Sequence, residues 1–409
     1  MIVDIIDKKR LGKELTYEEL KFFFKGYLKK EIKDYQMASL LMAICINGMS
    51  DLEIFNLTKI FIYSGETLDF SNIPGIKVDK HSTGGIGDKT TLIITPIVAS
   101  LGIPVVKMSG RGLGMTGGTI DKLESIPGFR VDLNDDEIME KVKNVGAVIT
   151  GQTRDLVPLD KVVYALRDVT ATVSSVPLIA SSIMSKKIAS GADKILIDIK
   201  VGNGALLKTM DEAVELSELM KKIGNYYNRE VRTKISDMNV PLGRAIGNSL
   251  EVIEALLVLR GEEKNSNLVN LCIELASEMV SMGKNISVEE ARFQVLESLE
   301  SGKAYNKFLE MVSEQGGNIA ELKASTKKQA VYASKDGVVQ TIDAMKVGQI
   351  FVDLGAGLRN MEDKIDYGVG IYLNKLVGDS VKKGEVLATI YKKEGENTLV
   401  DFDDVFVIK

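Results

Sequence analysis

The chain has 409 residues, which is enough for two or three domains with a sizeable buried core. Its 52 Lys and Arg against 57 Asp and Glu leave a net charge of −5, which gives no reason to expect a nucleic-acid partner. Two cysteines and one histidine exclude a disulfide framework, a thiolate metal site and a multi-histidine zinc site.

Cysteine usage and hydropathy predict a cytoplasmic protein with no membrane partner. Cys45 and Cys272 are the only cysteines, which suits a reducing compartment. The first residues show no charged-then-apolar export signal, because their apolar run stops at Asp7. The longest apolar stretches, Met37–Ile46 and Thr91–Val106, are too short or too interrupted to span a bilayer.

Helices are predicted over the first 65 residues. Thr16 with Glu19, and Ser50 with Glu53, have the spacing of capping boxes, and Asp34 is expected to cap the mostly apolar helix Tyr35–Cys45. A helix that is apolar on several faces must be covered. This favours a helical core, and a homodimer contact through the same helices is the sharper alternative.

From Ile73 onward, short β-branched runs alternate with helical patterns. The expected strands are Ile76–Val78, Val105–Lys107, Ala147–Thr150 and Lys194–Ile199, and the helices between them include Lys89–Leu101 and Asp135–Val145. This alternation predicts a mostly parallel sheet covered on both faces. Asp160–Thr172 and Ser174–Ala189 are predicted to be inserted helices that pack with the N-terminal ones.

The last third of the chain changes from helices to glycine-punctuated strands. Helices are predicted at Met210–Tyr227, Ser249–Gly261, Ser266–Met282 and Val288–Ser301, and a linker at Ala324–Ala330. Within Val377–Ile390 we expect two strands joined by a turn. Ala344-Met345-Lys346 resembles the attachment motif of biotin carrier domains, but it lacks the second Met and a hairpin context.

The predicted fold class is α/β with three parts. A small discontinuous all-helical domain takes residues 1–70 with the inserted helices 156–190. A larger α/β domain with a mostly parallel central sheet takes residues 71–155 and 191–328. A C-terminal α+β module takes residues 329–409.

Two glycine-rich segments follow predicted strands. The first, Lys80–Leu92, reads KHSTGGIGDKTTL; its backbone N–H groups and the start of the next helix suit an anion, with Ser82, Thr90 and Thr91 as hydroxyl donors. Alone it is a weak signal, because it is not a P-loop and a tight strand-to-helix connection explains it equally well. The second, residues 107–124, places Lys107, Ser109 and Thr119 among five glycines. Two such loops at the carboxyl ends of neighbouring strands predict one anion pocket at the sheet edge.

The second loop is similar to the signature of the thymidine and pyrimidine-nucleoside phosphorylase family, and Lys80–Asp88 resembles that family's other phosphate loop. The resemblance continues through Tyr164–Val173, Ser181–Lys187, Asp198–Ala205 and Leu242–Glu254 into the C-terminal module. It covers nearly the whole chain, and its motifs are long and particular.

The resemblance implies a reversible phosphorolysis of pyrimidine nucleosides to free base and pentose 1-phosphate. It implies that phosphate, the co-substrate, is surrounded by Lys80, His81, Ser82, Thr91, Lys107, Met108, Ser109 and Thr119. It places the base against Leu113, Tyr164, Arg167, Ser182 and Lys186, and a potassium ion against Gly87, Lys89, Leu242, Ala245 and Glu254. His81, Arg167 and Lys186 are the expected catalytic residues.

Spacing supports the base site independently, because Tyr164 with Arg167, and Ser182 with Lys186, can each share one helix face. Most pairs at this spacing lie on solvated charged helix faces. Here the family resemblance favours a base-binding role instead. As the only histidine, set between Lys80 and Ser82, His81 is a better catalytic candidate than most. Its alternative is a polar loop residue with a structural hydrogen bond.

Two residues depart from the family pattern. Lys89 stands where a family cation ligand would be; its backbone carbonyl can still coordinate, but its ammonium could weaken or replace potassium. Met115 stands where relatives often have a histidine, which puts in doubt a proton-transfer role for that loop.

The triplet Lys107-Met108-Ser109 resembles that of family members that accept both ribose and deoxyribose, and the Lys107 ammonium could hydrogen-bond a 2′-hydroxyl; a thymidine-restricted phosphorylase is the alternative. Phosphate and base residues lie in different parts of the chain, so we expect a hinge closure about Pro158, Thr150–Gln152 and Gly191.

An anthranilate-type phosphoribosyltransferase is a less favoured interpretation, since no acidic pair for magnesium diphosphate lies near either loop. A carrier module built on Lys346 is the non-enzyme alternative.

Overall fold

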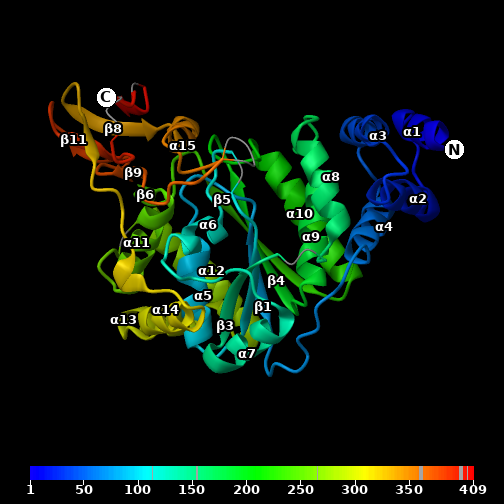
Figure 1. Ribbon diagram of the computed structural model, residues 1–409, viewed down its shortest axis with the longest axis horizontal. Helices are drawn as coiled ribbons and strands as arrows, with labels where there is room; N and C mark the ends of the chain where they lie inside the picture. Colours follow the sequence, from blue (N-terminus) through cyan, green and yellow to red (C-terminus); the bar gives the residue numbers. More distant parts are fainter. Residues whose placement is uncertain (113, 153–154, 265, 359–362, 396–398, 403) are drawn as a thin grey trace. The chain divides into compact units, whose positions relative to one another are not determined.

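The computed structural model describes residues 1–112, 114–152, 155–264, 266–358, 363–395, 399–402 and 404–409 (Figure 1). These residues form two compact units. The first unit contains residues 1–72, 153–197 and 209–233, and the second contains residues 73–152, 198–208 and 234–409. Of the three expected pivots, only Thr150–Gln152 adjoins a crossing between the units, because Pro158 and Gly191 both lie inside the first one.

The first unit is a helical bundle. Its helices are α1 (Ile2–Arg10), α2 (Tyr17–Leu28), α3 (Asp34–Asn47), α4 (Asp51–Ile62), α8 (Pro158–Asp168), α9 (Val176–Ala189) and α10 (Met210–Tyr226). Both predicted capping boxes are present, at Thr16 and at Ser50. The cap of α3 is Lys33, and Asp34 is already its first helical residue, so the predicted Asp34 cap is wrong. The inserted helices pack as expected, α9 on α4 and α8 on α2.

The central strands carry the site-bearing loops at their ends. They are β1 (Val78–Ser82), β2 (Val105–Ser109), β3 (Ala147–Gly151), β4 (Lys194–Val201) and β5 (Glu230–Asp237). One sheet has the order β1-β4-β5, and β2 pairs with β3 in parallel, with Val105 opposite Ala147. The β1 strand also contacts β2. The first strand begins at Val78, where the predicted one ends, and β5 was not predicted.

Several helices of the second unit pack on α5 (Thr90–Ser100), which is almost entirely buried. The other helices here are α6 (Thr119–Glu124), α7 (Asp135–Val145), α11 (Asn248–Leu259), α12 (Asn267–Lys284), α13 (Val288–Glu300), α14 (Lys303–Glu314) and the short 3₁₀ helix η1 (Ile319–Glu321). The α5 helix contacts α11, α12 and α14 (Figure 1). Its residues Thr90 to Ala99 are all buried, which fixes its first turn and the glycine loop before it.

Two small sheets and one helix make up the C-terminal region. The elements are β6 (Ala245–Ile246), β7 (Lys328–Tyr332), β8 (Gly337–Ile342), α15 (Ala344–Asp353), β9 (Gly370–Leu373), β10 (Ser380–Val381), β11 (Val386–Tyr391) and β12 (Phe406–Ile408). The sheet orders are β6-β9-β11-β7 and β10-β8-β12. The two strands expected within Val377–Ile390 exist, but they lie in different sheets and do not pair. Lys346 lies in the first turn of α15, not in a carrier hairpin.

The expected fold class is confirmed: a discontinuous helical domain, an α/β domain with parallel strand pairing, and a C-terminal module of strands and one helix. Among the described residues, none of the helices has the length and apolarity needed to cross a bilayer.

Candidate functional site

The first glycine loop is held by a carboxylate at its end. Asp88 accepts hydrogen bonds from the hydroxyls of Ser82 and Thr90 and from the Thr90 backbone N–H. Gly84 N–H donates to Ser82 Oγ over 3.2 Å, which closes the turn from the strand side. These contacts join the end of β1 to the start of α5. The loop is therefore ordered before any ligand arrives.

Buried positive charges surround this carboxylate. Lys80 Nζ donates to Thr90 Oγ1 over 2.6 Å and lies 3.5 Å from Asp198 Oδ2, and Lys200 Nζ lies 2.7 Å from the same oxygen. Burial by itself would raise the pKa of Asp88, but the ammonium groups of Lys80 and Lys200 hold it well below its ordinary value. Asp88 is thus ionised near neutral pH.

The second glycine loop is closed on itself by Asp121 of α6. Asp121 Oδ2 accepts the backbone N–H groups of Gly112 (2.6 Å) and Gly118 (3.2 Å), and Oδ1 accepts Arg111. The two glycines approach closely, because a Cβ on Gly118 would lie 2.1 Å from Gly112 N. Only glycine fits at this crossing of two backbones.

Lys122 ties the two glycine loops together. Its ammonium donates to Asp88 O over 2.7 Å and to Gly117 O over 3.1 Å, and it lies 3.0 Å from Glu251 Oε2. The side chain is 1 % exposed. Lys122 belongs to the glycine-loop motif, but its role could not be predicted from the sequence. Its ammonium donates to backbone carbonyls in both loops, and such acceptors leave no pattern in the sequence. We infer that it fixes the distance between the loops.

Three of the predicted phosphate residues meet at one small cavity. Lys80, Thr91 and Lys107 line a space of about 10 Å³ beside α5 and β2. Lys107 Nζ donates to Met108 O over 3.2 Å and lies 3.5 Å from Asp79 Oδ1. The cavity holds at most one water molecule, so it shows that these three side chains converge but not where phosphate binds; the rest of its lining is Ile94, Thr95, Val105 and Met279.

Four of the other phosphate candidates lie on the same two strands, and the fifth begins another helix. His81 and Ser82 end β1, Met108 and Ser109 end β2, and Thr119 is the first residue of α6. Met108 is buried, whereas His81, Ser82, Ser109 and Thr119 are half-buried. Seven of the eight candidates thus lie on β1, on β2 or in the first turn of α5, and Thr119 begins α6.

Arg167 of the predicted base site is wholly buried in the first unit. Its guanidinium donates to Thr172 O (3.2 Å), Val173 O (2.8 Å) and Leu178 O (3.2 Å). Burial lowers the pKa of this guanidinium, and the nearby carboxylate of Asp160 counters that effect. Three of its five N–H groups are thus committed to backbone carbonyls, which fixes the orientation of the guanidinium.

Tyr164 brings the two base-site cations together. Arg167 Cζ and Lys186 Nζ each lie 5.8 Å from the centre of the Tyr164 ring. Asp160, which is buried in the first turn of α8, lies 2.7 Å from Lys186 Nζ. Ser182 is buried one turn before Lys186 on α9. The predicted residues of α8 and α9 therefore form one cluster, and the last base candidate, Leu113, lies outside the described residues.

Asp160 is a residue of this cluster that sequence reasoning missed. Its signal is the spacing Asp160, Tyr164, Arg167, which puts all three on one face of α8. An acidic residue in a first turn is also the common partner of the helix dipole, so that spacing alone does not single it out.

The predicted potassium site does not fit that ion. Lys89 Nζ donates to Leu242 O over 2.9 Å, to Ala245 O over 2.8 Å and to Glu254 Oε2 over 2.6 Å. The lysine's own ammonium therefore takes the oxygens assigned to the cation. A second positive charge about 4 Å away would be repelled by about 4 kcal/mol even at an effective dielectric constant of 20. No step of the chemistry below uses a metal ion.

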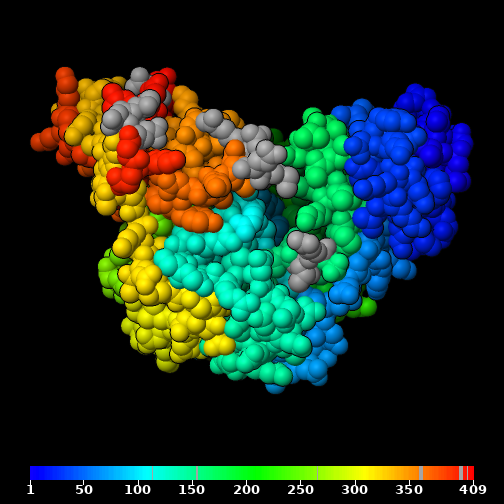
Figure 2. Space-filling model, viewed as in Figure 1, coloured from blue at the N-terminus to red at the C-terminus, as the bar shows by residue number. Residues whose placement is uncertain are grey.

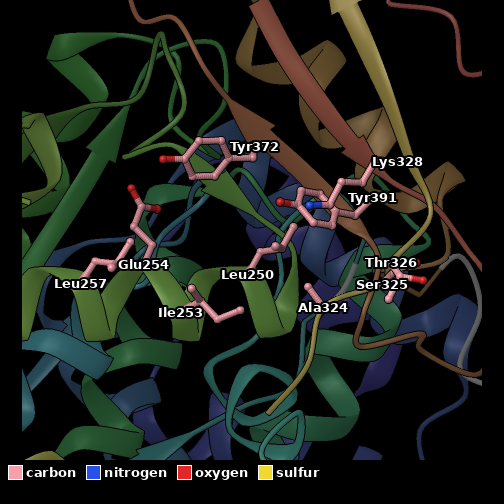
Figure 3. A pocket seen from close by; sticks show the side chains of 10 residues that line it. All are labelled: Leu250, Ile253, Glu254, Leu257, Ala324, Ser325, Thr326, Lys328, Tyr372 and Tyr391. Carbon is pink, nitrogen blue, oxygen red and sulfur yellow. The ribbon is translucent and has the colours of Figure 1, made fainter.

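Met115 and one larger pocket remain to be described. Met115 packs against the apolar cluster of the C-terminal region, which is a structural role. A pocket of about 430 Å³ lies between α11 and the strands β7, β9 and β11; Glu254, Leu257, Lys328, Tyr372 and Tyr391 contribute to its lining (Figure 3). Of the predicted site residues, only Glu254 is among those that line it.

Three family comparisons account for most of the chain. Residues 3–65 match the "Glycosyl transferase family, helical bundle domain", residues 75–305 the "Glycosyl transferase family, a/b domain", and residues 338–405 the "Pyrimidine nucleoside phosphorylase C-terminal domain". The Bacillus subtilis pyrimidine-nucleoside phosphorylase is 52% identical over 95% of this chain and 92% of its own length. The chain belongs to the pyrimidine-nucleoside phosphorylase family.

Further relatives agree. The Staphylococcus epidermidis pyrimidine-nucleoside phosphorylase is 49% identical over 100% of this chain and 96% of its own length, and the Geobacillus stearothermophilus one is 51% identical over 95% and 92%. Among solved structures, anthranilate phosphoribosyltransferase from Thermus thermophilus has a TM-score of 0.60 at 19% identity and covers 76% of this chain and 99% of its own. That likeness shows a shared fold only.

Proposed function

We propose that this protein catalyses the reversible phosphorolysis of pyrimidine nucleosides to a free base and a pentose 1-phosphate. Family membership at about half identity over nearly the whole chain supports the reaction class. The observation that carries the proposal is that β1 and β2 contact each other and each ends in a glycine loop, so that Lys80, Ser82 and Ser109 lie at neighbouring strand ends, where hydroxyls and backbone N–H groups suit inorganic phosphate.

The chemistry assigns a role to each cluster. A phosphate oxygen attacks C1′ as the C–N bond breaks, so positive charge grows on the sugar and the bonding electron pair leaves with the base. Lys80, Lys107 and the first turn of α5 hold the phosphate. Arg167 and Lys186 stabilise the negative charge on the departing base, and His81 donates a proton to its carbonyl oxygen.

The proposal predicts that base release depends on phosphate. The protein is incubated with uridine and with thymidine, each with and without inorganic phosphate, and free base and pentose 1-phosphate are measured. We expect both products only when phosphate is present. Equal release of base without phosphate would show a hydrolase and overturn the proposal.

The same assay measures sugar preference. We propose that both ribosides and deoxyribosides are substrates, because the buried Lys107 ammonium is a donor of the kind that a 2′-hydroxyl requires. Turnover of thymidine alone would favour the thymidine-restricted alternative. Formation of nucleotide from a base and phosphoribosyl diphosphate would favour the phosphoribosyltransferase alternative.

We propose further that the protein is a homodimer through its helical domain. On α3, Tyr35, Met42 and Ile46 form an exposed apolar stripe, with Tyr35 71% and Ile46 74% exposed. The N-terminal helices, among them α3 with this stripe, are coloured blue in Figure 2.

We also propose a cytoplasmic location, because Cys45 and Cys272 are both free thiols.

Ile46→Glu is expected to shift the protein from dimer to monomer, because it places a charge within the proposed apolar contact. Sedimentation velocity measures the change. Phe293→Glu is the matched control, since Phe293 is 70% exposed but lies on α13 of the other unit. An Ile46→Glu protein with the same oligomeric state as the control would contradict the assignment of this face.

A further inference from the structure

The ammonium of Lys89 is saturated by three oxygens of the second unit. It donates to the carbonyls of Leu242 and Ala245 and to the carboxylate of Glu254, at 2.6 to 2.9 Å. An ammonium has three N–H donors, so each donor has its acceptor. The Lys89 side chain is fully buried, and that of Glu254 is 3% exposed. The site is complete in itself.

Glu254 needs no further cation. Its carboxylate accepts Lys89, and it also accepts the backbone N–H groups of Arg244 (2.7 Å) and Ala245 (2.8 Å). A buried ion pair persists when its remaining hydrogen-bonding capacity is satisfied in this way. Charge and hydrogen bonding are both balanced inside the protein.

The space around the ammonium is closed by backbone. Gly87 has a φ of +75°, and a Cβ there would lie 2.7 Å from Leu242 O. The glycine loop thus comes against the same carbonyl that accepts Lys89. A monovalent cation has access to these oxygens only if the ammonium leaves them.

Lys89 joins parts of the unit that are far apart in the sequence. It lies at the N-cap of α5, directly after the first glycine loop, whereas Glu254 belongs to α11. Ala245 belongs to β6, which pairs with β9 of the C-terminal region. The ammonium therefore connects the phosphate loop to α11 and, through β6, to the C-terminal sheet.

We propose that Lys89 is a tethered replacement for the monovalent cation: its ammonium holds Leu242, Ala245 and Glu254 in place, so this protein neither binds nor requires potassium. Loss of the ammonium alone would leave an oxygen-lined site that accepts a free cation. Potassium and ammonium ions are similar in size and charge, so either one would restore the connection.

The first experiment needs no variant. The thermal unfolding midpoint and the turnover number of the unchanged protein are measured in potassium, ammonium and tetramethylammonium chloride at one ionic strength. We expect no difference between the three salts. A midpoint raised by potassium relative to tetramethylammonium would overturn the proposal, because a cation bound only by the folded state stabilises it.

The second experiment creates the cation requirement. Lys89→Thr removes the ammonium and leaves space, whereas Lys89→Met fills that space with an apolar chain. In tetramethylammonium chloride we expect both variants to unfold several degrees lower than the unchanged protein. Potassium or ammonium should restore Lys89→Thr and leave Lys89→Met unchanged.

Lys323→Thr is the matched control, because Lys323 is exposed and lies outside the helices and strands. It should match the unchanged protein in every salt. An unfolding midpoint of Lys89→Thr that equals this control in tetramethylammonium chloride would refute the role of the ammonium. If neither Lys89 variant folds, the salt comparison on the unchanged protein decides the question.

Discussion

Arg167→Met is expected to lower the turnover number for pyrimidine-nucleoside phosphorolysis on the order of a hundredfold. The departing base takes the electrons of the C–N bond, and a preorganised donor to such a developing anion contributes about 2.7–4 kcal/mol. Steady-state kinetics with uridine and saturating phosphate measures the loss. Arg167→Lys keeps the charge but not the fork of donors, so we expect an intermediate turnover number.

The structure also changes what this substitution does to stability. The guanidinium satisfies the carbonyls of Thr172, Val173 and Leu178, and a buried polar group left without its partner costs about 1–3 kcal/mol. Truncation of Arg167 is therefore expected to lower stability as well as turnover. Kinetics are measured well below the unfolding midpoint of each variant.

Lys161→Met is the control for Arg167. Lys161 is exposed on the same helix, so its loss tests whether any cation of α8 matters for turnover. A folded Arg167→Met protein with the turnover number of this control would remove Arg167 from the mechanism.

Elements with strong local signals could be predicted from the sequence. The helix Asp135–Val145 was predicted with the bounds of α7, because Asn134 caps its start and Gly146, with a φ of +83°, ends it. Both signals lie within one turn of the helix ends. The pairing of strands that are distant in sequence could not be predicted in the same way. The β10 strand pairs with β8, and β11 pairs with β7 and β9, so β10 and β11 do not pair with each other.

The strand β1 shows why functional segments are hard to predict. Its sequence VDKHS carries charged residues that ordinarily exclude a buried strand, yet Asp79 and Lys80 are 2% and 3% exposed. The burial depends on counterions from elsewhere, Asp198 for Lys80 and Lys107 for Asp79. The sequence shows the loops that hold these groups, but not the partners that allow their burial.

Whether a site residue could be predicted also depended on whether its partners can be recognised in the sequence. Residues in recognisable motifs, such as Lys80 and Arg167, were found by pattern and resemblance. Asp160 and Lys122 were missed because they act on groups that are distant in sequence or belong to the backbone. Lys89 is an intermediate case: the sequence flagged it as a departure, and only the structure shows which oxygens its ammonium takes.

Gly118→Ala is expected to lower kcat/KM for phosphate on the order of a hundredfold, because a displacement of about 1 Å in a positioning group has an effect of that size. Gly118 has a φ of −78°, so alanine meets no conformational barrier there. The obstacle is steric: the new Cβ would lie 2.1 Å from Gly112 N and 2.4 Å from the Arg111 carbonyl carbon. Both contacts are backbone, so no side chain can rotate away and the loop must open.

Opening the loop pulls Gly112 N–H and Gly118 N–H from Asp121 and moves the segment that begins at Ser109. Phosphate saturation curves at constant uridine measure the loss. Gly110→Ala is the matched control, because it adds the same methyl group to the same loop with no atom within 4 Å. We expect Gly110→Ala to keep a KM for phosphate near that of the unchanged protein. If Gly118→Ala behaves in the same way, the second glycine loop does not position the phosphate.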